Sequence, residues 1–194
     1  MLFRSKIDRL IRASRLQFPT ASANLGHWRD GGGRDRILSA SVFQAERFLL
    51  DHLRDSHRPK LINATKRRLI SGELAPGQSG VDVECTDSVN APSVTDLFFA
   101  LGEFTVHSRV RTAVVSANRQ LIVRLDQWRV EITDEYDWEP GRWALIPGIG
   151  RVTHTEMLAL AKAGYGRRYH VSSEWAPITD PEVTAPATLP AGNY

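Results

Sequence analysis

The segment from Phe104 to Ile132 constrains the fold most, because apolar and polar residues alternate along two successive runs. In the first run the apolar side chains are at even-numbered positions: Phe104, Val106, Val110 and Val114. Such alternation is typical of a β-strand with one buried face. Residues 116–119 include Asn118, which tolerates a left-handed backbone and so predicts a turn. We therefore expect a β-hairpin.

The second run changes phase partway along. Its apolar residues are first odd-numbered and then even-numbered: Leu121, Val123 and Leu125, then Trp128, Val130 and Ile132. A slip of one residue turns the later side chains to the opposite face unless an extra residue is absorbed. The sequence therefore predicts a β-bulge at Asp126–Gln127, which re-aims the residues that follow.

Those following residues include the main candidates for chemistry, Asp134, Tyr136 and Asp137. In an extended segment Asp134 and Tyr136 share a face, and a turn after Tyr136 can bring Asp137 to the same side. Two converging carboxylates can hold Mg²⁺ or Ca²⁺, or can share a proton. The candidates for a phosphate clamp or a general acid are Arg142, His154, Arg167 and His170. The same acids also suit a turn and the aromatic residues suit packing, and residue types and spacing alone favour that structural interpretation.

The run Asp134-x-Tyr136-Asp137-Trp138, which follows a Leu-Gly turn and the hairpin, resembles the catalytic region of colicin M-type bacteriocins. Those enzymes cleave the pyrophosphate linkage of the undecaprenyl-linked peptidoglycan precursor and depend on Mg²⁺. Their motif reads Asp-x-Tyr-Asp-Phe, with a His-Arg pair a few residues later. The resemblance implies that Asp134 and Asp137 bind the metal and that Tyr136 orients the substrate.

The His-Arg pair has no direct counterpart, since residues 140–143 read Pro-Gly-Arg-Trp. Arg142 is the arginine that can be carried over, and His154 would have to supply the imidazole from a different position. His154 or His170 would then serve as acid or base. The wider pattern also looks like uncharacterised bacterial proteins associated with secreted toxin and effector systems.

These resemblances imply an antibacterial toxin or effector domain that acts as a metal-assisted phosphodiester or polyprenyl-pyrophosphate hydrolase. The expected partners are a polyprenyl-pyrophosphate-linked cell-wall precursor and a cognate immunity or secretion-system protein. The expected location is the cytoplasm of the producing bacterium, with delivery to a target cell by a specialised secretion system. The sequence predicts no transmembrane segment and no signal peptide.

Two other functions are compatible with the sequence. The first is a non-catalytic adaptor of a secretion system, which would bind through the hairpin edge and four tryptophans: Trp128, Trp138, Trp143 and Trp175. The second is nucleic-acid binding, because residues 1–75 hold 15 Lys and Arg against 7 Asp and Glu, a net charge of +8. No nucleic-acid recognition motif accompanies this charge, so the sequence does not favour the second function.

The predicted fold class is α+β, with an N-terminal helical layer packed on a small antiparallel β-sheet and one late helix. We expect a single domain over residues 1–175, with a helical part at 1–72 and a sheet part at 80–175. Residues 176–194 contain four prolines and predict a disordered tail.

Within the helical part, the pattern predicts helices at 6–16, 36–56 and 60–70, the last two as an αα-hairpin. Residues 19–34 are glycine-rich and predict a loop. His52 and His57 are five residues apart and do not share a face of an α-helix, so we expect no metal pair there.

Within the sheet part, Val81, Val83 and Cys85 predict an edge strand, and the acidic neighbours of Cys85 predict an unreactive thiol. Residues 143–146 predict a short buried strand, followed by a turn at 147–150. Thr153 and Glu156 form a capping-box pattern ahead of a helix that ends at Gly164. Residues 167–175 predict a final strand.

Overall fold

The computed structural model describes residues 2–30, 32–42, 46–78, 80–93, 95–138, 140–146 and 150–190. It divides into two compact units, which are described separately. Unit 1 consists of Met1–Leu38, Val89–Phe104 and Thr133–Ser172, and unit 2 of Ser39–Ser88, Thr105–Ile132 and Ser173–Tyr194. The predicted turn at 147–149, part of the predicted helix at 43–45 and the last four residues lie outside the described residues.

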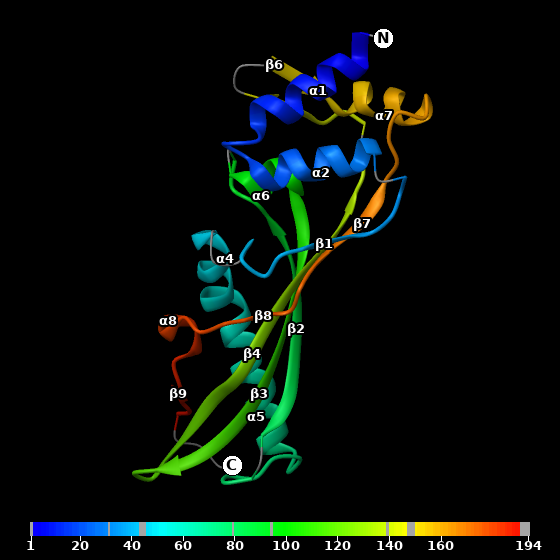
Figure 1. Cartoon of the computed structure of the whole chain (residues 1–194). Coiled ribbons are helices and arrows are strands. Elements are labelled where there is room, and N and C mark those ends of the chain that lie inside the picture. The colour runs from blue at the N-terminus through cyan, green and yellow to red at the C-terminus, as the bar shows by residue number, and fades with distance from the viewer. Residues whose placement is uncertain are drawn as a thin grey trace. The chain divides into compact units, whose positions relative to one another are not determined.

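Both units contain helices and strands, which confirms the α+β fold class (Figure 1). The helices are α1 (Leu2–Ser14), α2 (Pro19–Asp30), α4 (Arg47–His52), the π-helical turn η1 (Leu53–His57), α5 (Arg58–Ile70), α6 (Asp96–Ala100), α7 (His154–Lys162) and α8 (Pro181–Thr184). The strands are β1 (Arg36–Leu38), β2 (Val81–Asn90), β3 (Glu103–Ala117), β4 (Gln120–Tyr136), β5 (Trp143–Ile146), β6 (Gly150–Thr153), β7 (Tyr169–Ser173), β8 (Ala176–Pro177) and β9 (Ala187–Thr188).

The main sheet has the strand order β1-β7-β4-β3-β2, and β8 and β9 also pair with β4. Strand β4 is antiparallel to β7, β8 and β9. Strand β2 lies at the edge of this order, as the alternation of Val81, Val83 and Cys85 predicts. Strands β5 and β6 form a separate two-stranded sheet.

The predicted hairpin and bulge are present. Asn118 and Arg119 have φ angles of 50° and 61°, which suit a two-residue turn between β3 and β4. Gln127 also has a positive φ of 52°. The buried positions of β4 are odd-numbered before Gln127 and even-numbered after it, because the extra residue preserves one buried face.

The predicted αα-hairpin is wrong. Helix α4, the turn η1 and helix α5 form one continuous helical segment, since the junction residues His52, Leu53, His57 and Arg58 all have right-handed helical backbone angles. Pro59 lies within this segment, directly after the π-helical turn η1. Residues 36–38, predicted as the start of a helix, form β1 instead.

The loop predicted at 19–34 is also wrong for most of its length, because residues 19–30 form helix α2. Pro19 begins the helix, and the Asp96 carboxylate accepts hydrogen bonds from the N–H groups of Thr20 and Ala21 at 2.8 and 2.9 Å. This acid caps the helix from 75 residues away in the sequence, so no local capping pattern marks the start. Leu25 and Trp28 are buried on one side of the helix.

Residues 176–190, predicted as part of a disordered tail, contain β8, α8 and β9. Ile178, Val183 and Leu189 are buried at 7%, 2% and 5% exposure, so the segment contributes to the core of unit 2. The Asp180 side chain caps α8 by accepting from the N–H of Glu182 and Val183. Proline, which has no N–H to donate, is tolerated in this segment because most of its residues do not pair in a continuous strand ladder.

The predicted elements after β4 are largely present. Thr153 and Glu156 form the full capping box of α7, with both reciprocal hydrogen bonds made. Tyr169, Val171 and Ser173 are the buried residues of β7. The burial predicted for residues 143–146 is wrong at Trp143 and Leu145, which are 54% and 64% exposed.

Candidate functional site

The candidate site in unit 1 is built where β4 pairs with β7. Asp134 lies opposite Val171 and Tyr136 lies opposite Tyr169. Residues that face each other across an antiparallel pair point to the same side of the sheet, so Asp134 and the two tyrosines share a face. This confirms the predicted common orientation of Asp134 and Tyr136.

Asp134 has an unusual ionisation. Burial raises the pKa of its carboxyl to about 7. A hydrogen bond from the backbone of Glu135 acts in the opposite direction, and the negative charges of Asp137, Glu135 and Glu103 raise the pKa further. A carboxyl group with a pKa near neutrality can gain or lose a proton at physiological pH. It can also bind a cation in place of that proton. Asp134 is therefore the residue of the motif that is best suited to chemistry.

Several aromatic rings in mutual contact lie near this carboxyl group. Tyr136 stacks on Tyr169 with ring centroids 5.1 Å apart, and Tyr136 meets Trp138 edge-on at 5.5 Å. Trp138 in turn meets the His154 imidazole edge-on at 5.0 Å and Trp28 at 5.8 Å. The aromatic contacts therefore connect Tyr136, in the motif, to His154, at the start of α7.

The two phenols are neutral at physiological pH. Burial raises the pKa of Tyr136 well above 10 and also raises the pKa of Tyr169, while the positive charge of Arg36 opposes both shifts. Neutral phenols can donate hydrogen bonds but are poor nucleophiles. The Tyr169 hydroxyl donates to the carbonyl oxygen of Asn24 at 2.9 Å, which ties β7 to α2.

Arg142 and His154 are 12 positions apart in the sequence but adjacent in space. The backbone N–H of His154 donates to the carbonyl oxygen of Arg142 at 3.0 Å, because the β5–β6 pairing brings their neighbours Trp143 and Thr153 opposite each other. The structure thus brings the backbones of an arginine and a histidine together although they are distant in the sequence. The side chains of Asp137 and Arg142 are exposed.

Two of the predicted candidates lie away from Asp134. His170 is paired with Glu135 on the opposite face of the β4–β7 pair, so its imidazole points away from Asp134. Its backbone N–H donates to Asp35 at 3.2 Å. Arg167 is exposed in the segment before β7, where its backbone N–H donates to the carbonyl oxygen of Trp28.

Sequence reasoning missed Arg36, which lies in β1. Its guanidinium group binds the side-chain oxygen of Asn24, and its charge acts on both Tyr136 and Tyr169. Asn24 is fully buried and also donates to the carbonyl oxygen of Ala100 at 3.2 Å. Arg36 is therefore a half-buried cation beside the phenols. No local pattern marks it, because its role depends on β1 and not on the helix predicted there.

The carboxylates suit a magnesium ion in donor type and number. Mg²⁺ is commonly held by one or two carboxylates, with water and phosphate oxygens in the remaining positions. Among the described residues, Asp134 and Asp137 are not joined by a third gathered His, Cys, Asp or Glu donor.

The single cysteine carries no reactive thiol. Burial and the negative charge of Asp87 raise the pKa of Cys85 to about 11. The thiol is consequently protonated near neutrality and is a poor nucleophile. The direction of this shift agrees with the effect expected from its acidic neighbours.

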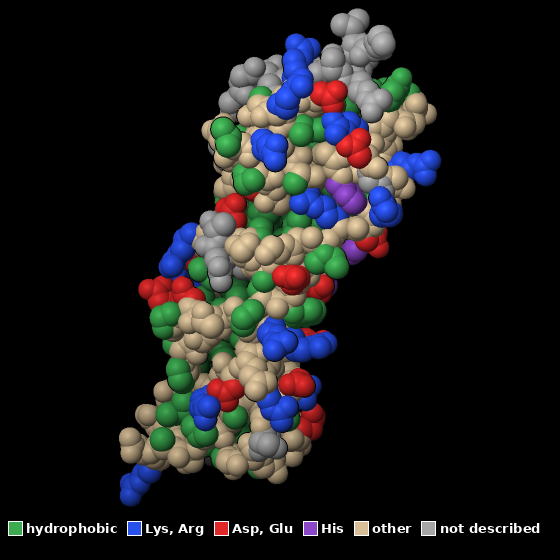
Figure 2. All heavy atoms as spheres, in the orientation of Figure 1, with side chains coloured by type: hydrophobic (Ala, Val, Ile, Leu, Met, Phe, Trp, Pro, Cys, Tyr) green, Lys and Arg blue, Asp and Glu red, His purple; other side chains and the backbone are tan. Residues whose placement is uncertain are grey.

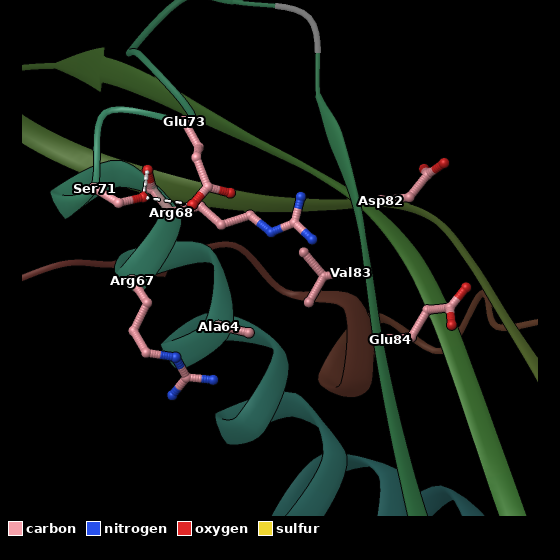
Figure 3. A pocket seen from close by; sticks show the side chains of 8 residues that line it. All are labelled: Ala64, Arg67, Arg68, Ser71, Glu73, Asp82, Val83 and Glu84. Atoms are coloured by element: carbon pink, nitrogen blue, oxygen red, sulfur yellow. Dashed lines mark hydrogen bonds between the residues drawn. The ribbon is translucent and has the colours of Figure 1, made fainter.

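A polar depression between α5 and β2 in unit 2 offers no comparable chemistry. It is lined by Ala64, Arg67, Arg68, Ser71, Glu73, Asp82, Val83 and Glu84 (Figure 3). Arginines of α5 and carboxylates of β2 line it together, and the Ser71 hydroxyl donates to Glu73 at 3.0 Å. This mixture of charges favours neither a phosphate nor a cation.

The basic N-terminal half is partly neutralised by the fold. Arg29 pairs with Asp8 and Asp30, Arg54 pairs with Asp51 and Asp55, and Lys60 pairs with Asp87. On the face drawn in Figure 2, basic and acidic side chains are interspersed. Nucleic-acid binding requires cations that are free to contact phosphates, so these pairings weigh against it.

Two of the four tryptophans proposed as a binding surface are not available for one. Trp128 is 1% exposed, and its indole N–H donates to the Ser108 hydroxyl at 3.0 Å. Trp138 is packed between other rings. Trp143 is 54% and Trp175 37% exposed, and each has an arginine over its ring.

Comparisons with known proteins give one structural similarity. No protein-family model matches the chain, and no curated protein matches it. The chain is similar to the solved structure of PaeM, a colicin M-like bacteriocin produced by Pseudomonas aeruginosa, with 15% sequence identity and a TM-score of 0.40. The similarity covers 90% of this chain and 52% of that one, so the chain spans about half the length of PaeM. None of the described helices has the length and apolar character needed to cross a membrane.

Proposed function

We propose that the chain is an antibacterial toxin domain that hydrolyses a polyprenyl-pyrophosphate or related phosphodiester bond with the help of Mg²⁺. The observation that carries this proposal is the partly buried Asp134 carboxyl group, with its pKa near 7, in an Asp-x-Tyr-Asp-Trp motif on the face that also holds Tyr136. The proposal rests on these residues and on the resemblance of the motif to that of the colicin M-type bacteriocins.

In this proposal Asp134 and Asp137 hold the cation, which neutralises phosphate charge and orients the phosphoryl group. Asp134 loses its proton when the cation binds, because the cation favours the carboxylate over the neutral acid. The neutral Tyr136 phenol donates a hydrogen bond to a substrate oxygen. The buried indole N–H of Trp138 has no hydrogen-bond partner among the described residues and is a second donor of this kind.

The remaining roles fall to His154 and the arginines. His154 is the histidine that the aromatic contacts connect to the motif, so it is the proposed acid that protonates the leaving phosphate oxygen. His170 points to the other face and is assigned no role. Arg36 and Arg142 are the proposed contacts for phosphate oxygens, since guanidinium groups bind them in a forked geometry.

The test measures Mg²⁺-dependent hydrolysis of a purified polyprenyl-pyrophosphate-linked cell-wall precursor. We expect turnover with Mg²⁺, none with a chelator, and a loss of at least about 100-fold in Asp134→Asn and Asp137→Asn, because each removes a metal ligand. Glu135→Gln is the matched control, since Glu135 lies between them on the opposite face and pairs with Arg168 at 3.6 Å. Absence of turnover by folded wild-type protein, or equal activity in all variants, would refute the proposal.

A non-catalytic adaptor is the second candidate, and exposed apolar residues favour it. Trp143 and Leu145 of β5 are exposed on a two-stranded hairpin, where they could meet a partner protein. Binding of an immunity or secretion-system protein that is lost in Leu145→Asp and unchanged in Asp134→Asn would support this function. The two candidates therefore predict opposite effects of the two substitutions.

A further inference from the structure

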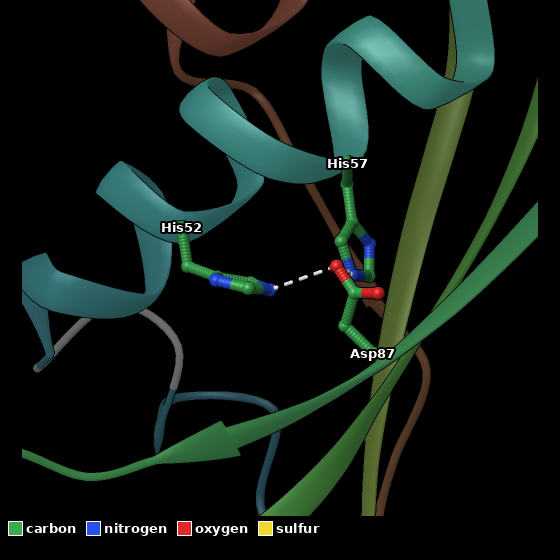
Figure 4. Close-up of side chains that lie close together, drawn as sticks. All are labelled: His52, His57 and Asp87. Atoms are coloured by element: carbon green, nitrogen blue, oxygen red, sulfur yellow. Dashed lines mark ion pairs between the residues drawn. The ribbon is translucent and has the colours of Figure 1, made fainter.

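Three side chains of unit 2 converge at a point that the proposed function does not use. His52 ends α4, His57 ends η1, and Asp87 lies on β2 (Figure 4). The Nε2 atoms of both imidazoles lie 3.4 Å from the same Asp87 oxygen, Oδ2. One donor atom from each of the three residues lies within 4.8 Å of the other two.

The π-helical turn makes this convergence possible. In an α-helix, five residues turn through about 500°, so side chains five apart point about 140° away from each other. A π-helical turn has i→i+5 hydrogen bonds and places such residues nearly one above the other. The His52 and His57 rings are accordingly 5.1 Å apart. The expectation from sequence that the two histidines lie on different faces of the helix is therefore wrong.

His57 is held in the orientation that a metal ligand requires. Its Nδ1 lies 2.6 Å from the Ser108 hydroxyl oxygen, which also accepts the Trp128 indole N–H. In the tautomer whose Nδ1 carries the proton, His57 donates to the Ser108 hydroxyl oxygen and its Nε2 has a lone pair. The lone pair of His57 Nε2 then faces Asp87. A hydrogen bond at the distal nitrogen is the usual support of a metal-binding histidine.

The Nε2 atoms of both histidines have no other use in the described structure. His57 is 0% exposed, and both Nε2 atoms are buried without a hydrogen-bond partner among the described residues. Burial lowers the pKa of His57 to about 4 and also lowers the pKa of His52, which in both rings favours the neutral form that binds metals. Among the described residues, the nearest charged group to both Nε2 atoms is therefore the Asp87 carboxylate.

Lys60 and Ser56 stabilise Asp87 as an anionic ligand. The Lys60 ammonium group binds Oδ1, and the Ser56 hydroxyl donates to Oδ2 at 2.6 Å. Burial acts against ionisation, but these hydrogen bonds and the nearby positive charge keep the pKa of Asp87 below its usual value. Oδ2 retains a lone pair for a further partner, because a carboxylate oxygen can accept two hydrogen bonds or ligands.

We propose that His52, His57 and Asp87 bind a divalent zinc ion or a zinc-like transition metal. Tetrahedral zinc with bonds of about 2.0–2.2 Å places its ligand atoms about 3.3–3.5 Å apart, and the two nitrogen-to-oxygen distances here are 3.4 Å. Two imidazoles and one carboxylate are ligands that zinc accepts, and the fourth position is left to water. The His52 side chain is 24% exposed, which gives the ion a route from solvent.

The experiment uses the full chain after removal of metals with a chelator. We expect one equivalent of Zn²⁺ by native mass spectrometry, and with Co²⁺ a visible absorption of the strength typical of tetrahedral coordination. His57→Gln, His52→Gln and Asp87→Asn should each weaken Zn²⁺ binding at least about 100-fold. Ser108→Ala should weaken it about 10- to 100-fold, because Ser108 orients His57.

His107→Gln is the matched control. His107 precedes Ser108 on β3 and therefore points to the opposite face, where its Nδ1 contacts the Thr86 hydroxyl at 3.2 Å. Its substitution should leave Zn²⁺ binding unchanged. Asp134→Asn should also leave it unchanged, so this proposal can fail or hold independently of the proposed function.

Two results would overturn the proposal. One is the absence of stoichiometric Zn²⁺ binding by wild-type protein. The other is equal binding by the wild type and by variants whose circular dichroism shows that they are folded. If a variant does not fold, nuclear magnetic resonance of wild-type protein decides, since Zn²⁺ must shift the His52 and His57 imidazole signals and leave that of His107 in place.

Discussion

Burial gives individual ionisable side chains of this protein properties that their residue type alone does not provide. Asp134 and His57 are both shifted mainly by burial, the acid to a pKa of about 7 and the imidazole to about 4. In both cases burial favours the neutral form. Each residue belongs to one of the two cation sites proposed above.

The ionisation of Asp134 has a measurable consequence for stability. Its folded-state pKa of about 7 lies above the unfolded value of about 4, so its contribution is present below pH 4 and is lost as pH rises to 7. In Asp134→Asn this loss should be absent. The free energy of unfolding of the variant, relative to that of the wild type, should therefore rise by roughly 1–3 kcal/mol between pH 4 and pH 7.5. Urea unfolding in a chelator at a series of pH values measures it.

Glu135→Gln controls for the removal of one negative charge from the same strand, because Glu135 is exposed on the opposite face. A stability difference between Asp134→Asn and wild type that stays constant across this pH range would contradict the assignment of a raised pKa to Asp134. Addition of Mg²⁺ at pH 7.5 should stabilise the wild type and leave Asp134→Asn unaffected.

At the scale of elements, close contacts between segments distant in sequence decide the local structure. The Asp96 side chain caps helix α2, and Gly166 packs closely against Trp28 of α2. A Cβ atom added at Gly166 would overlap the Trp28 indole ring. A Cβ atom added at Gly26, within α2, would meet nothing within 4 Å among the described residues.

Two glycine-to-alanine substitutions should therefore have opposite effects on unit 1. Gly166→Ala should destabilise by about 1–3 kcal/mol, because the Trp28 ring must move out of a packed position. Gly26→Ala should stabilise by up to about 1 kcal/mol, because alanine favours the helix and has space. Chemical denaturation followed by tryptophan fluorescence measures both. Equal effects of the two substitutions would show that α2 does not pack against Gly166.

At the scale of the whole molecule, the C-terminal segment is part of the folded structure. Ile178 is 7% exposed, and its backbone N–H donates to the carbonyl oxygen of Trp128 at 2.9 Å. Strands β8 and β9 pair with β4 at Val130 and Val123 respectively. The segment therefore covers residues of β4 that would otherwise meet water.

Ile178→Ala should cost about 2–4 kcal/mol, the usual range for removing a buried isoleucine side chain. Thr179→Ala is the control, since the neighbouring Thr179 is exposed and should change stability by less than about 0.5 kcal/mol. Thermal unfolding and the rate of protease cleavage after residue 175 measure the effect. Rapid cleavage of folded wild-type protein within residues 176–190 would indicate the disordered tail that composition predicts.

The sequence by itself determined the features that depend on near neighbours. The alternation of Val106 and Val110 predicts β3, the phase change predicts the bulge at Gln127, and Thr153 with Glu156 predicts the start of α7. In each case the physical cause acts within a few residues: the pleat of a strand, one extra residue, or the hydrogen bonds of a helix end. The shared orientation of Asp134 and Tyr136 follows from the same strand geometry.

Tertiary structure decided the features that depend on partners far away in the chain. Asp96 caps α2 across 75 residues, and the backbone of Arg142 meets that of His154 through the β5–β6 pairing. The π-helical turn brings His52 and His57 onto Asp87, although an ordinary helix would separate them. These contacts exist because burial and strand pairing bring distant groups to one place, and the order of residues along the chain carries no local sign of that.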